Sequence, residues 1–214
     1  MVTITNLKNI VQKMKRAGHI IDSVFDIGAN KGKWTEEWLL VCPSATFSLF
    51  EANPYHYRPD NLDVKHKWFN IVLSKPGIDN VEFYSINNTG DSYYKENTTH
   101  YNQSVKLNLK ANTLDKIVNT FNLIPPQLIK LDTQGSEVDI LLGAEHTLKT
   151  ADIVVCEMPI LEYNIGAPMF NDYLTIFKSL DFIPVCIDQE HFSKGSLLQI
   201  DMVFLKSSKV HMIC

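Results

Sequence analysis

The chain alternates between short apolar runs and segments in which apolar residues recur every three or four positions. The short runs end at turn-forming residues and predict strands, whereas the helical spacing predicts helices between them. Strand and helix therefore alternate, which predicts an α/β domain with a mostly parallel sheet. The predicted strands are 23–27, 46–50, 64–74, 81–86, 128–131, 153–156, 182–187 and 198–205, with 104–109 extending the edge; the predicted helices are 1–18, 34–41, 114–121, 137–148 and 173–180.

The first predicted helix, within residues 1–18, is amphipathic and basic. A helix of this kind is compatible with a membrane surface or a transit peptide. The segment lacks the Arg and Ser enrichment of transit peptides, so we expect a helix that covers one end of the sheet. Its apolar positions at helical spacing are Leu7, Ile10, Val11 and Met14.

Residues 87–103 differ from the rest of the chain. They are rich in Asn, Thr, Tyr and Gly, show no hydrophobic period, and exceed the length of an ordinary connection. Long irregular segments of this kind are frequently binding loops. We expect a lid or substrate loop here, within a single domain that spans residues 1–214 without internal repeats.

The composition argues against several classes of protein. The 214 residues are 45% hydrophobic, enough for one core, but no run approaches the roughly 18 apolar residues of a membrane span. The net charge of −4 disfavours a nucleic-acid partner, because binding a phosphate backbone needs clustered Lys and Arg. Four scattered cysteines without zinc-ligand spacing predict reduced thiols and a cytoplasmic location. The composition does not constrain the oligomeric state.

Two glycines follow the first predicted strand, and a glutamate ends the second. In an open α/β sheet the ends of neighbouring strands form one ligand pocket, so Gly28, Gly32 and Glu51 should meet there. Glycine allows the backbone to approach a ligand closely, and a carboxylate can accept hydrogen bonds from two ribose hydroxyls. The alternative is an ordinary turn at Gly28 and a solvated strand end at Glu51.

This loop lacks the full dinucleotide fingerprint, which requires three glycines. Asn30 and Lys33 stand at the second and third glycine positions. Asp26, beside the loop, is a poor neighbour for a diphosphate but suits the ammonium and sulfonium charges of S-adenosylmethionine. Electrostatics therefore favours the methyl donor, with an NAD(P)-dependent oxidoreductase as the alternative.

Four segments resemble the FkbM-type methyltransferases: FDIGANKG at 25–32, FEANP at 50–54, IKLDTQGSE at 129–137 and LLGA at 141–144. The likeness extends over about residues 24–157. It implies the class I methyltransferase fold, a Rossmann-like, mostly parallel seven-stranded sheet with helices on both faces and an antiparallel last strand. It also implies S-adenosyl-L-methionine as methyl donor and O-methylation, often of sugar hydroxyls or related metabolites.

The resemblance also implies roles for individual residues. The donor loop would comprise Asp26, Gly28, Ala29, Asn30 and Gly32, and the ribose contact would be Glu51 with Ala52 beside it. Asn70 and Ser74 would contact the adenine. The segment facing the reaction centre would contain Asp132, Gln134, Gly135 and Glu137.

Methyl transfer to a hydroxyl requires a group that takes the hydroxyl proton. Asp132 and Glu157 each follow a predicted strand, so we expect one of them to be this base and Glu137 to orient the acceptor or the loop. Glu137 is also compatible with a simple favourable charge at a helix N-terminus. In the expected lid, His100 is an alternative base, and Tyr93, Tyr94 and Tyr101 could stack on an acceptor or simply lie at the surface.

The sequence predicts no metal site, although the pair Asp132 and Glu157 could instead bind a divalent cation, as in catechol-type enzymes. Those enzymes carry a further Asp-Asn pair at the next strand, whereas here Met158 follows Glu157. The expected partner is a small-molecule or glycan acceptor. A nucleobase N-methyltransferase would carry an N/D-P-P-aromatic motif where Asp132 to Gly135 stand. A non-catalytic S-adenosylmethionine-binding domain remains open.

Overall fold

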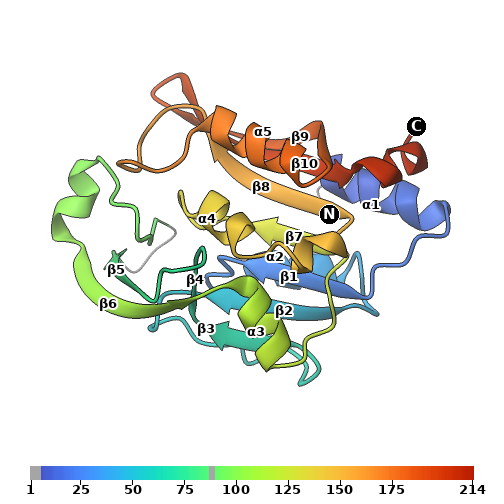
Figure 1. The fold of residues 1–214 in the computed structure, drawn as a ribbon, viewed down its shortest axis with the longest axis horizontal. Helices are drawn as coiled ribbons and strands as arrows, with labels where there is room; N and C mark the ends of the chain where they lie inside the picture. The colour runs from blue at the N-terminus through green and yellow to red at the C-terminus, as the bar shows by residue number, and fades with distance from the viewer. Residues whose placement is uncertain (1–5, 87–89) are drawn as a thin grey trace.

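The computed structural model describes residues 6–86 and 90–214, and a seven-stranded sheet forms its centre (Figure 1). The five strands β3, β2, β1, β7 and β8 are mutually parallel, each beside the next in this order. The sheet continues through β10 to β9 at the far edge. The bounds are β1 Ser23–Ile27, β2 Thr46–Glu51, β3 Lys67–Asn70, β7 Leu128–Leu131, β8 Ile153–Pro159, β9 Phe182–Ser193 and β10 Ser196–Lys206.

The last strand runs against its neighbours. β10 is antiparallel to both β8 and β9, so it forms a hairpin with β9 and leaves β9 parallel to the rest. The mostly parallel seven-stranded sheet with an antiparallel last strand confirms the predicted fold class.

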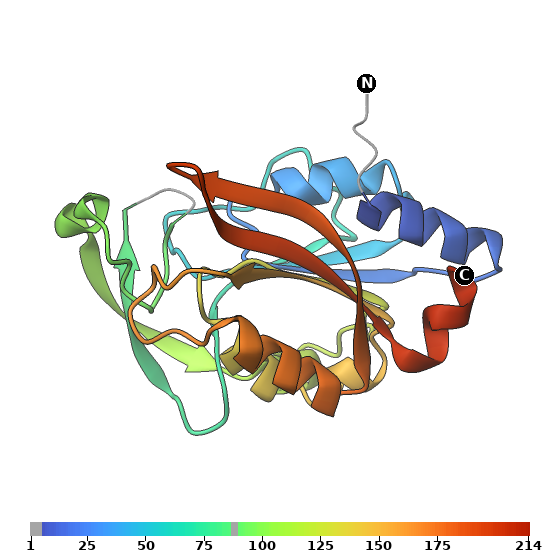
Figure 2. The ribbon, with the colours of Figure 1, turned by 90° about the horizontal axis from the view of Figure 1, so that it is seen from above.

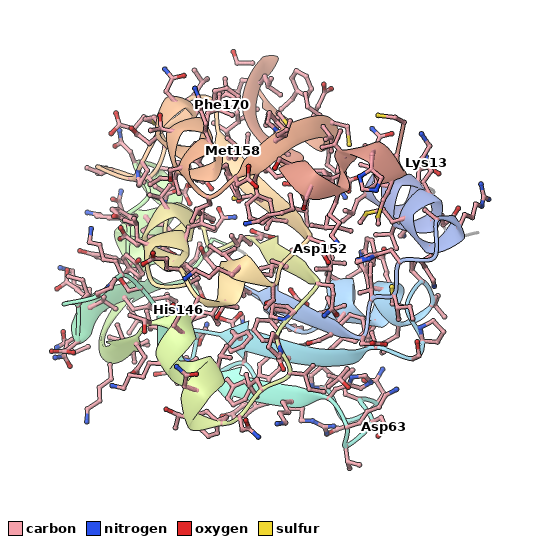
Figure 3. The ribbon with its side chains drawn as sticks, turned by 45° about the vertical axis from the view of Figure 1, so that its right-hand side comes forward. Lys13, Asp63, His146, Asp152, Met158 and Phe170 are labelled. Atoms are coloured by element: carbon pink, nitrogen blue, oxygen red, sulfur yellow. The ribbon has the colours of Figure 1, made fainter. Side chains whose placement is uncertain are left out.

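Helices cover both faces of this sheet (Figure 2). α1 (Asn6–Arg16) and α2 (Lys33–Leu39) pack on one face, and α3 (Leu114–Thr120), α4 (Glu137–Leu142) and α5 (Phe170–Ser179) on the other. β1 is buried along its whole length, and successive residues such as Val24 and Phe25 enter opposite cores. Met158 of β8, labelled in Figure 3, belongs to the core beneath α5, and the partly buried Phe170 of α5, also labelled, packs against it.

A second, three-stranded sheet joins β4 (Val72–Leu73), β6 (Val105–Asn112) and β5 (Asn80–Ser85). The continuous strand predicted over 64–74 is therefore wrong, because the chain changes sheets at Ile71. The Ile71 amide still donates to Glu51 O of β2, at 2.8 Å, whereas the Ser74 amide donates to Asn112 O of β6, at 2.9 Å. Residues 105–109 belong to this sheet and do not extend the edge of the large one.

Two predicted boundaries shift for identifiable reasons. The helix predicted over 137–148 ends at Leu142, where Gly143 caps it, and a short 3₁₀ turn η2 (Thr147–Lys149) follows. β8 continues past Glu157 to Pro159 because β10 pairs with it that far. Glu157 thus lies within the strand instead of at its tip.

The ends of the described chain lie side by side (Figures 1 and 3). Lys13 Nζ of α1 donates to Ile213 O, at 2.9 Å, just after the 3₁₀ helix η3 (Ser207–Met212). The α1 residues Leu7, Val11 and Met14 are almost completely buried. Among the described helices, none combines the length and apolar character needed to cross a membrane.

Candidate active site

A cavity of about 890 Å³ opens at the carboxyl ends of β1, β2 and β7. This volume lies in the range of small-molecule and cofactor sites. Its position agrees with the general rule for ligands of open α/β sheets. Sequence-predicted residues that line it are Gly28, Ala29, Asn30, Glu51, Ala52, Asp132, Gln134 and Glu157.

The loop after β1 is fitted closely to the loop after β7. Gly28 has a φ of +77°, and a Cβ atom there would lie 1.7 Å from Asp132 O, so no other residue fits. The amides of Gly28 and Ala29 both donate to Phe50 O, at 2.9 and 3.1 Å, which holds the loop against β2. The glycine therefore brings two site-forming loops into contact.

Glu51 is held at the end of β2 by backbone amides. Its Oε2 accepts from the Asn30 amide at 2.6 Å, and its Oε1 accepts from the Asn53 amide at 2.8 Å. Each carboxylate oxygen has two acceptor positions, so Glu51 retains capacity for ligand hydroxyls. The side-chain Oδ1 of Asn30 is buried without a hydrogen-bond partner among the described residues. A ligand with donor groups in this part of the cavity would satisfy both residues.

Asp26 is completely buried behind the loop and does not line the cavity itself. Its carboxylate accepts a 2.7 Å hydrogen bond from Thr35 Oγ1 and pairs with Lys130 Nζ at 3.4 Å. Burial raises the pKa of Asp26, while Lys130 and Thr35 oppose that shift. Asp26 therefore contacts the ammonium of Lys130, which lines the cavity, and does not itself border the cavity.

Lys130 links three parts of the site. Its Nζ lies 3.1 Å from Asp132 Oδ2 and donates to Gly28 O at 3.0 Å, in addition to its contact with Asp26. Burial alone would lower the pKa of Lys130, but the Asp132 and Asp26 carboxylates outweigh it and raise the pKa. For Asp132, burial would raise the pKa, but the Lys130 ammonium holds it below its ordinary value. Asp132 is thus ionised at neutral pH, with 39% of its side chain exposed.

Gln134 connects the two predicted candidate bases. Its Nε2 donates to Asp132 Oδ1 at 3.1 Å and to Glu157 Oε2 at 2.6 Å, and Tyr163 OH donates to its Oε1. Burial, followed by the nearby carboxylates of Asp132, Glu137 and Asp201, raises the pKa of Glu157 well above its ordinary value. The two carboxylates therefore differ in proton affinity although one amide holds both.

Glu137 is buried beneath the loop and does not line the large cavity. Its Oε1 accepts from Thr133 N and Oγ1, at 2.6 and 3.0 Å, and its Oε2 accepts from Gly135 N at 3.0 Å and Tyr173 OH at 2.6 Å. These four bonds fix the loop that carries Asp132 and Gln134. Of the two roles expected for Glu137, orienting the loop fits these contacts.

Three other residues predicted to contact the methyl donor do not line the cavity: Asn70, Ser74 and Gly32. Asn70 Nδ2 donates to Glu51 O and Asn53 O, at 3.1 and 2.9 Å, and so braces the end of β2. Ser74 lies 3.3 Å from Tyr93 OH through its Oγ. Gly32, with φ +74°, begins α2, where a Cβ atom would lie 2.8 Å from the ring of Pro59. The cavity wall beyond β3 is instead apolar, at Ile71, Val72 and Leu73.

The segment predicted as a lid borders the cavity through residues 90–93 and Glu96. Tyr93 and Tyr94 both donate to Asp139 Oδ2, and Tyr101 OH donates to Gly90 O. Burial raises the pKa of all three tyrosines, and nearby carboxylates add to the shift, so their hydroxyls stay protonated. Residues 87–89 and the side chain of His100, the alternative base, lie outside the described part of the structure.

The lid segment is hydrogen-bonded to a second loop, at residues 163–165. Asn97 N donates to Tyr163 O, Ile165 N donates to Lys95 O at 2.8 Å, and Asn164 Nδ2 donates to Tyr94 O at 2.9 Å. Gln199 Nε2 of β10 also donates to Tyr163 OH, at 2.8 Å. Two segments far apart in sequence thus form one side of the cavity.

Several residues that line the cavity have no role predicted from the sequence. Lys130 could have been recognised from the sequence, because a lysine within an apolar, buried strand needs a carboxylate or another hydrogen-bond partner. His56 Nδ1 lies 3.7 Å from Glu51 Oε1, and the Glu51 carboxylate raises the pKa of His56. His191 lines the far wall beside Glu157, and no motif marked it. Tyr163 and Gln199 also lie there, contributed by a loop and an antiparallel strand.

Comparisons with solved structures give distant likenesses. WbdD shares a TM-score of 0.50 at 10% identity, covering 94% of this chain and 39% of that one. Magnesium protoporphyrin IX methyltransferase from Synechocystis PCC 6803, solved with bound S-adenosylmethionine, gives 0.46 at 8% identity, covering 94% and 78%. Precorrin-6y C5,15-methyltransferase from Geobacter metallireducens gives 0.47 at 11%, covering 95% and 90%. A search of curated proteins found no match.

The sequence itself matches a known family over most of its length. The methyltransferase FkbM domain covers residues 26–184, from the end of β1 into β9. This span contains the glycine loop and Glu51, and also Lys130, Asp132 and Gln134, all of which line the cavity. The chain therefore belongs to the FkbM family of methyltransferases, which use S-adenosylmethionine as the methyl donor.

Proposed function

We propose that this protein transfers the methyl group to a hydroxyl of a sugar, a glycan or another small metabolite. The observation that carries the proposal is the ionised Asp132 carboxylate, partly exposed in the cavity and held by Lys130 at 3.1 Å. Among nucleophiles, a hydroxyl in particular must lose a proton as it attacks, and this carboxylate is available to accept it.

The walls of the cavity suit the methyl donor chemically. Glu51 is positioned to accept hydrogen bonds from the ribose hydroxyls, and the unpartnered Asn30 Oδ1 can accept a further hydrogen bond nearby. The apolar wall at residues 71–73 suits an adenine ring. Asp132 and Gln134 would border the other end of the donor, where the reacting methyl group lies. When bound, the donor supplies a methyl group already activated by its sulfonium.

Catalysis then depends on what the chain's own residues do to the acceptor. The network of Gln134 and Lys130 fixes Asp132, which orients the acceptor hydroxyl toward the methyl group and accepts its proton. Glu157 is the weaker candidate base at neutral pH, because its raised pKa favours the protonated form. Glu137 acts at one remove, by holding the loop that carries Asp132.

The acceptor side of the cavity favours a compound rich in hydroxyls. Tyr163, His191 and Gln199 line it together with Glu96 of the lid segment, and all four offer hydrogen-bonding groups. We expect a small-molecule or glycan acceptor for this reason, and no nucleic acid. The four cysteines are free thiols, which is compatible with the cytoplasmic location expected from the sequence.

Calorimetric titration tests the donor assignment. S-adenosylhomocysteine should bind the purified chain, and NADH should not. Tight NADH binding without a response to S-adenosylhomocysteine would instead favour the oxidoreductase alternative.

A turnover assay then tests whether the chain is an enzyme. S-adenosylhomocysteine should be released from S-adenosylmethionine in the presence of candidate sugars and polyols. Binding of the methyl donor without release of S-adenosylhomocysteine for any hydroxylated acceptor would favour a non-catalytic binding domain.

Asp132→Asn tests the proposed base. We expect kcat to fall about a hundredfold or more, because general-base catalysis is lost, while the affinity for S-adenosylhomocysteine changes little. Single-turnover rates and calorimetry measure the two quantities. The matched control is Asp91→Asn, a carboxylate that lines the cavity at the lid and bonds to Asn53 and Ile86. Wild-type turnover by Asp132→Asn would rule out Asp132 as the base.

A further inference from the structure

Three potential metal ligands meet in the acceptor wall of the cavity, on three adjacent strands. Glu157 lies on β8, Asp201 directly opposite it on β10, and His191 on β9. One ligand atom from each lies within 4.8 Å of the other two, and His191 Nε2 is 3.3 Å from Asp201 Oδ1. Glu157 and His191 both line the cavity, so a bound ion would be open to it.

These separations fit a single ion. Nitrogen and carboxylate oxygen ligands lie about 2.0–2.2 Å from a transition-metal ion, so neighbouring ligand atoms are roughly 3 Å apart and opposite ones roughly 4.4 Å apart. The 3.3 Å between His191 and Asp201 matches a neighbouring pair. The upper limit of 4.8 Å needs only small side-chain rotations to close.

The charges around this cluster favour a cation independently of the ligand geometry. Asp132 and Glu157 share the Gln134 amide, and Asp201 lies opposite Glu157. Lys130 is the ammonium that contacts Asp132. Of the other two, Glu157 receives the neutral Gln134 amide and Asp201 faces the His191 ring. Once ionised as ligands, Glu157 and Asp201 would bring two negative charges here, which a divalent ion would offset.

A chain of hydrogen bonds already orients the carboxyl group of Glu157. Gln134 Nε2 donates to Glu157 Oε2, Tyr163 OH donates to Gln134 Oε1, and Gln199 Nε2 donates to Tyr163 OH. Hydrogen bonds of this kind fix the orientation of ligating carboxylates in metal sites. Neutral side chains thus hold the Glu157 carboxyl group in place.

We propose that Glu157, His191 and Asp201 bind one divalent transition-metal ion, of the Mn²⁺ or Zn²⁺ type, in the acceptor wall of the cavity. The imidazole ligand favours such ions over Ca²⁺, which prefers oxygen ligands alone. Three protein ligands leave coordination positions open toward the cavity. The site differs from the Asp132–Glu157 pair considered from the sequence, because two of its ligands come from the β9–β10 hairpin.

The role of the ion rests on the proposed methyl transfer, but its binding does not. Beside an acceptor hydroxyl, a divalent charge lowers the pKa of that hydroxyl. The proton passes to the Asp132 carboxylate, the hydroxyl oxygen forms the bond to the methyl carbon, and the carbon–sulfur bond electrons stay on sulfur. Binding is therefore tested without donor, acceptor or turnover.

The test uses the full chain, freed of metal by a chelator and titrated with MnCl₂ while free Mn²⁺ is followed by electron paramagnetic resonance. We expect one saturable site in the wild type. His191→Gln and Asp201→Asn should each weaken it about tenfold or more, because each removes a ligand. The matched control is Glu190→Gln, the exposed residue before His191 on the same strand, which should bind as the wild type does.

Two outcomes would overturn the proposal: no saturable wild-type site up to about 1 mM Mn²⁺, or undiminished binding by both ligand variants. Circular dichroism establishes that each variant is folded. Should a variant fail to fold, electron spin echo modulation of Mn²⁺ bound to the wild type decides, because a ¹⁴N coupling is expected from His191 and its absence contradicts the site. Loss of methyl transfer with intact Mn²⁺ binding would count against the proposed function alone.

Discussion

At the scale of single residues, Lys130 has the most consequential contacts in the site. Its ammonium contacts Asp26, Asp132 and the carbonyl of Gly28, which belong to β1, to the loop after β7 and to the loop after β1. A buried ion pair is costly to break, because the remaining partner keeps its desolvated charge. The position of the candidate base and the shape of the glycine loop therefore depend on one side chain.

Lys130→Met should lower the free energy of unfolding by about 3–5 kcal/mol, because Asp26 would be left buried without its cation. Affinity for S-adenosylhomocysteine should fall as well, since the glycine loop loses one of the hydrogen bonds that hold it. Denaturant unfolding and calorimetry measure the two effects. The control is Lys106→Met, which removes an exposed lysine paired with Glu82 and should change neither quantity measurably. Similar losses in both variants would contradict this account of Lys130.

His66 predicts a pH dependence of stability. Its Nδ1 accepts a 3.0 Å hydrogen bond from the Phe47 amide in the core, and burial, with Lys65 adding to it, lowers its pKa. In the unfolded chain His66 takes up a proton below about pH 6.5. In the folded protein it remains neutral at that pH, so the free energy of unfolding falls as the pH drops through about 6.5.

His66→Gln should reduce this acid-side slope, although the lost packing lowers stability at every pH. Denaturant unfolding from about pH 7.5 to 5 measures the slope, and the exposed His211→Gln should retain the wild-type slope. An unchanged slope in His66→Gln would show that other groups cause the acid sensitivity.

Residue patterns predicted one half of the site better than the other. Gly28, Asn30, Glu51, Asp132 and Gln134 follow the ends of parallel strands, where a general rule locates ligands, and all of them line the cavity. The contacts of Asp26 with Lys130 and Thr35 required three-dimensional information, because the sequence does not show which cation a buried carboxylate meets. No comparable rule exists for His191 and Asp201.

At the scale of elements, the loop between β7 and α4 is shaped by the first residue of the helix that follows it. Glu137 accepts four hydrogen bonds, three of them from Thr133 and Gly135 within the loop. Both Gln134 and Gly135 have positive φ, at +58° and +103°, so the loop needs this support to keep its conformation.

Glu137→Gln should lower the free energy of unfolding by about 1–3 kcal/mol, because an amide group replaces an oxygen that accepts from buried donors. Tyr173→Phe removes only one of the four bonds and should cost less, about 1 kcal/mol. Denaturant unfolding compares the two. A Glu137→Gln variant with wild-type stability and strongly reduced kcat would instead indicate direct contact with the acceptor.

Element boundaries were predictable where a strand is buried on both faces, as in β1 and β7, whose observed ends equal the predicted ones. The break between β3 and β4 was not, because Val72 and Leu73 continue the apolar pattern although they pair with another sheet. Hydrophobic periodicity reports burial, and it does not report which strand is the partner.

At the scale of the whole molecule, two cores lie on opposite faces of one sheet, and α1 closes one of them. Leu7 N donates to Asp188 Oδ1 of β9 at 2.7 Å, and Lys13 reaches the residue after η3. The beginning and the end of the described chain therefore stabilise each other, and α1 should unfold together with the sheet.

Met14→Ala tests this dependence. The Met14 side chain is completely buried, so its truncation should cost about 2–5 kcal/mol, whereas the exposed Gln12→Ala should stay within about 0.5 kcal/mol of the wild type. Tryptophan fluorescence and circular dichroism should report one common unfolding transition. A negligible cost for Met14→Ala would return α1 to the alternatives of a membrane-surface helix or a transit peptide.

The β9–β10 hairpin has an evolutionary consequence under the proposals made above. The groups expected to hold the donor come from β1, β2 and β7, whereas His191, Gln199 and Asp201 come from a hairpin whose turn, at Lys194 and Gly195, is exposed. Insertions or substitutions in this hairpin can change the acceptor wall without altering the glycine loop or Glu51. New acceptors can therefore be acquired by mutation of one hairpin while selection preserves the donor half, which gives a single scaffold a route to diverse substrates.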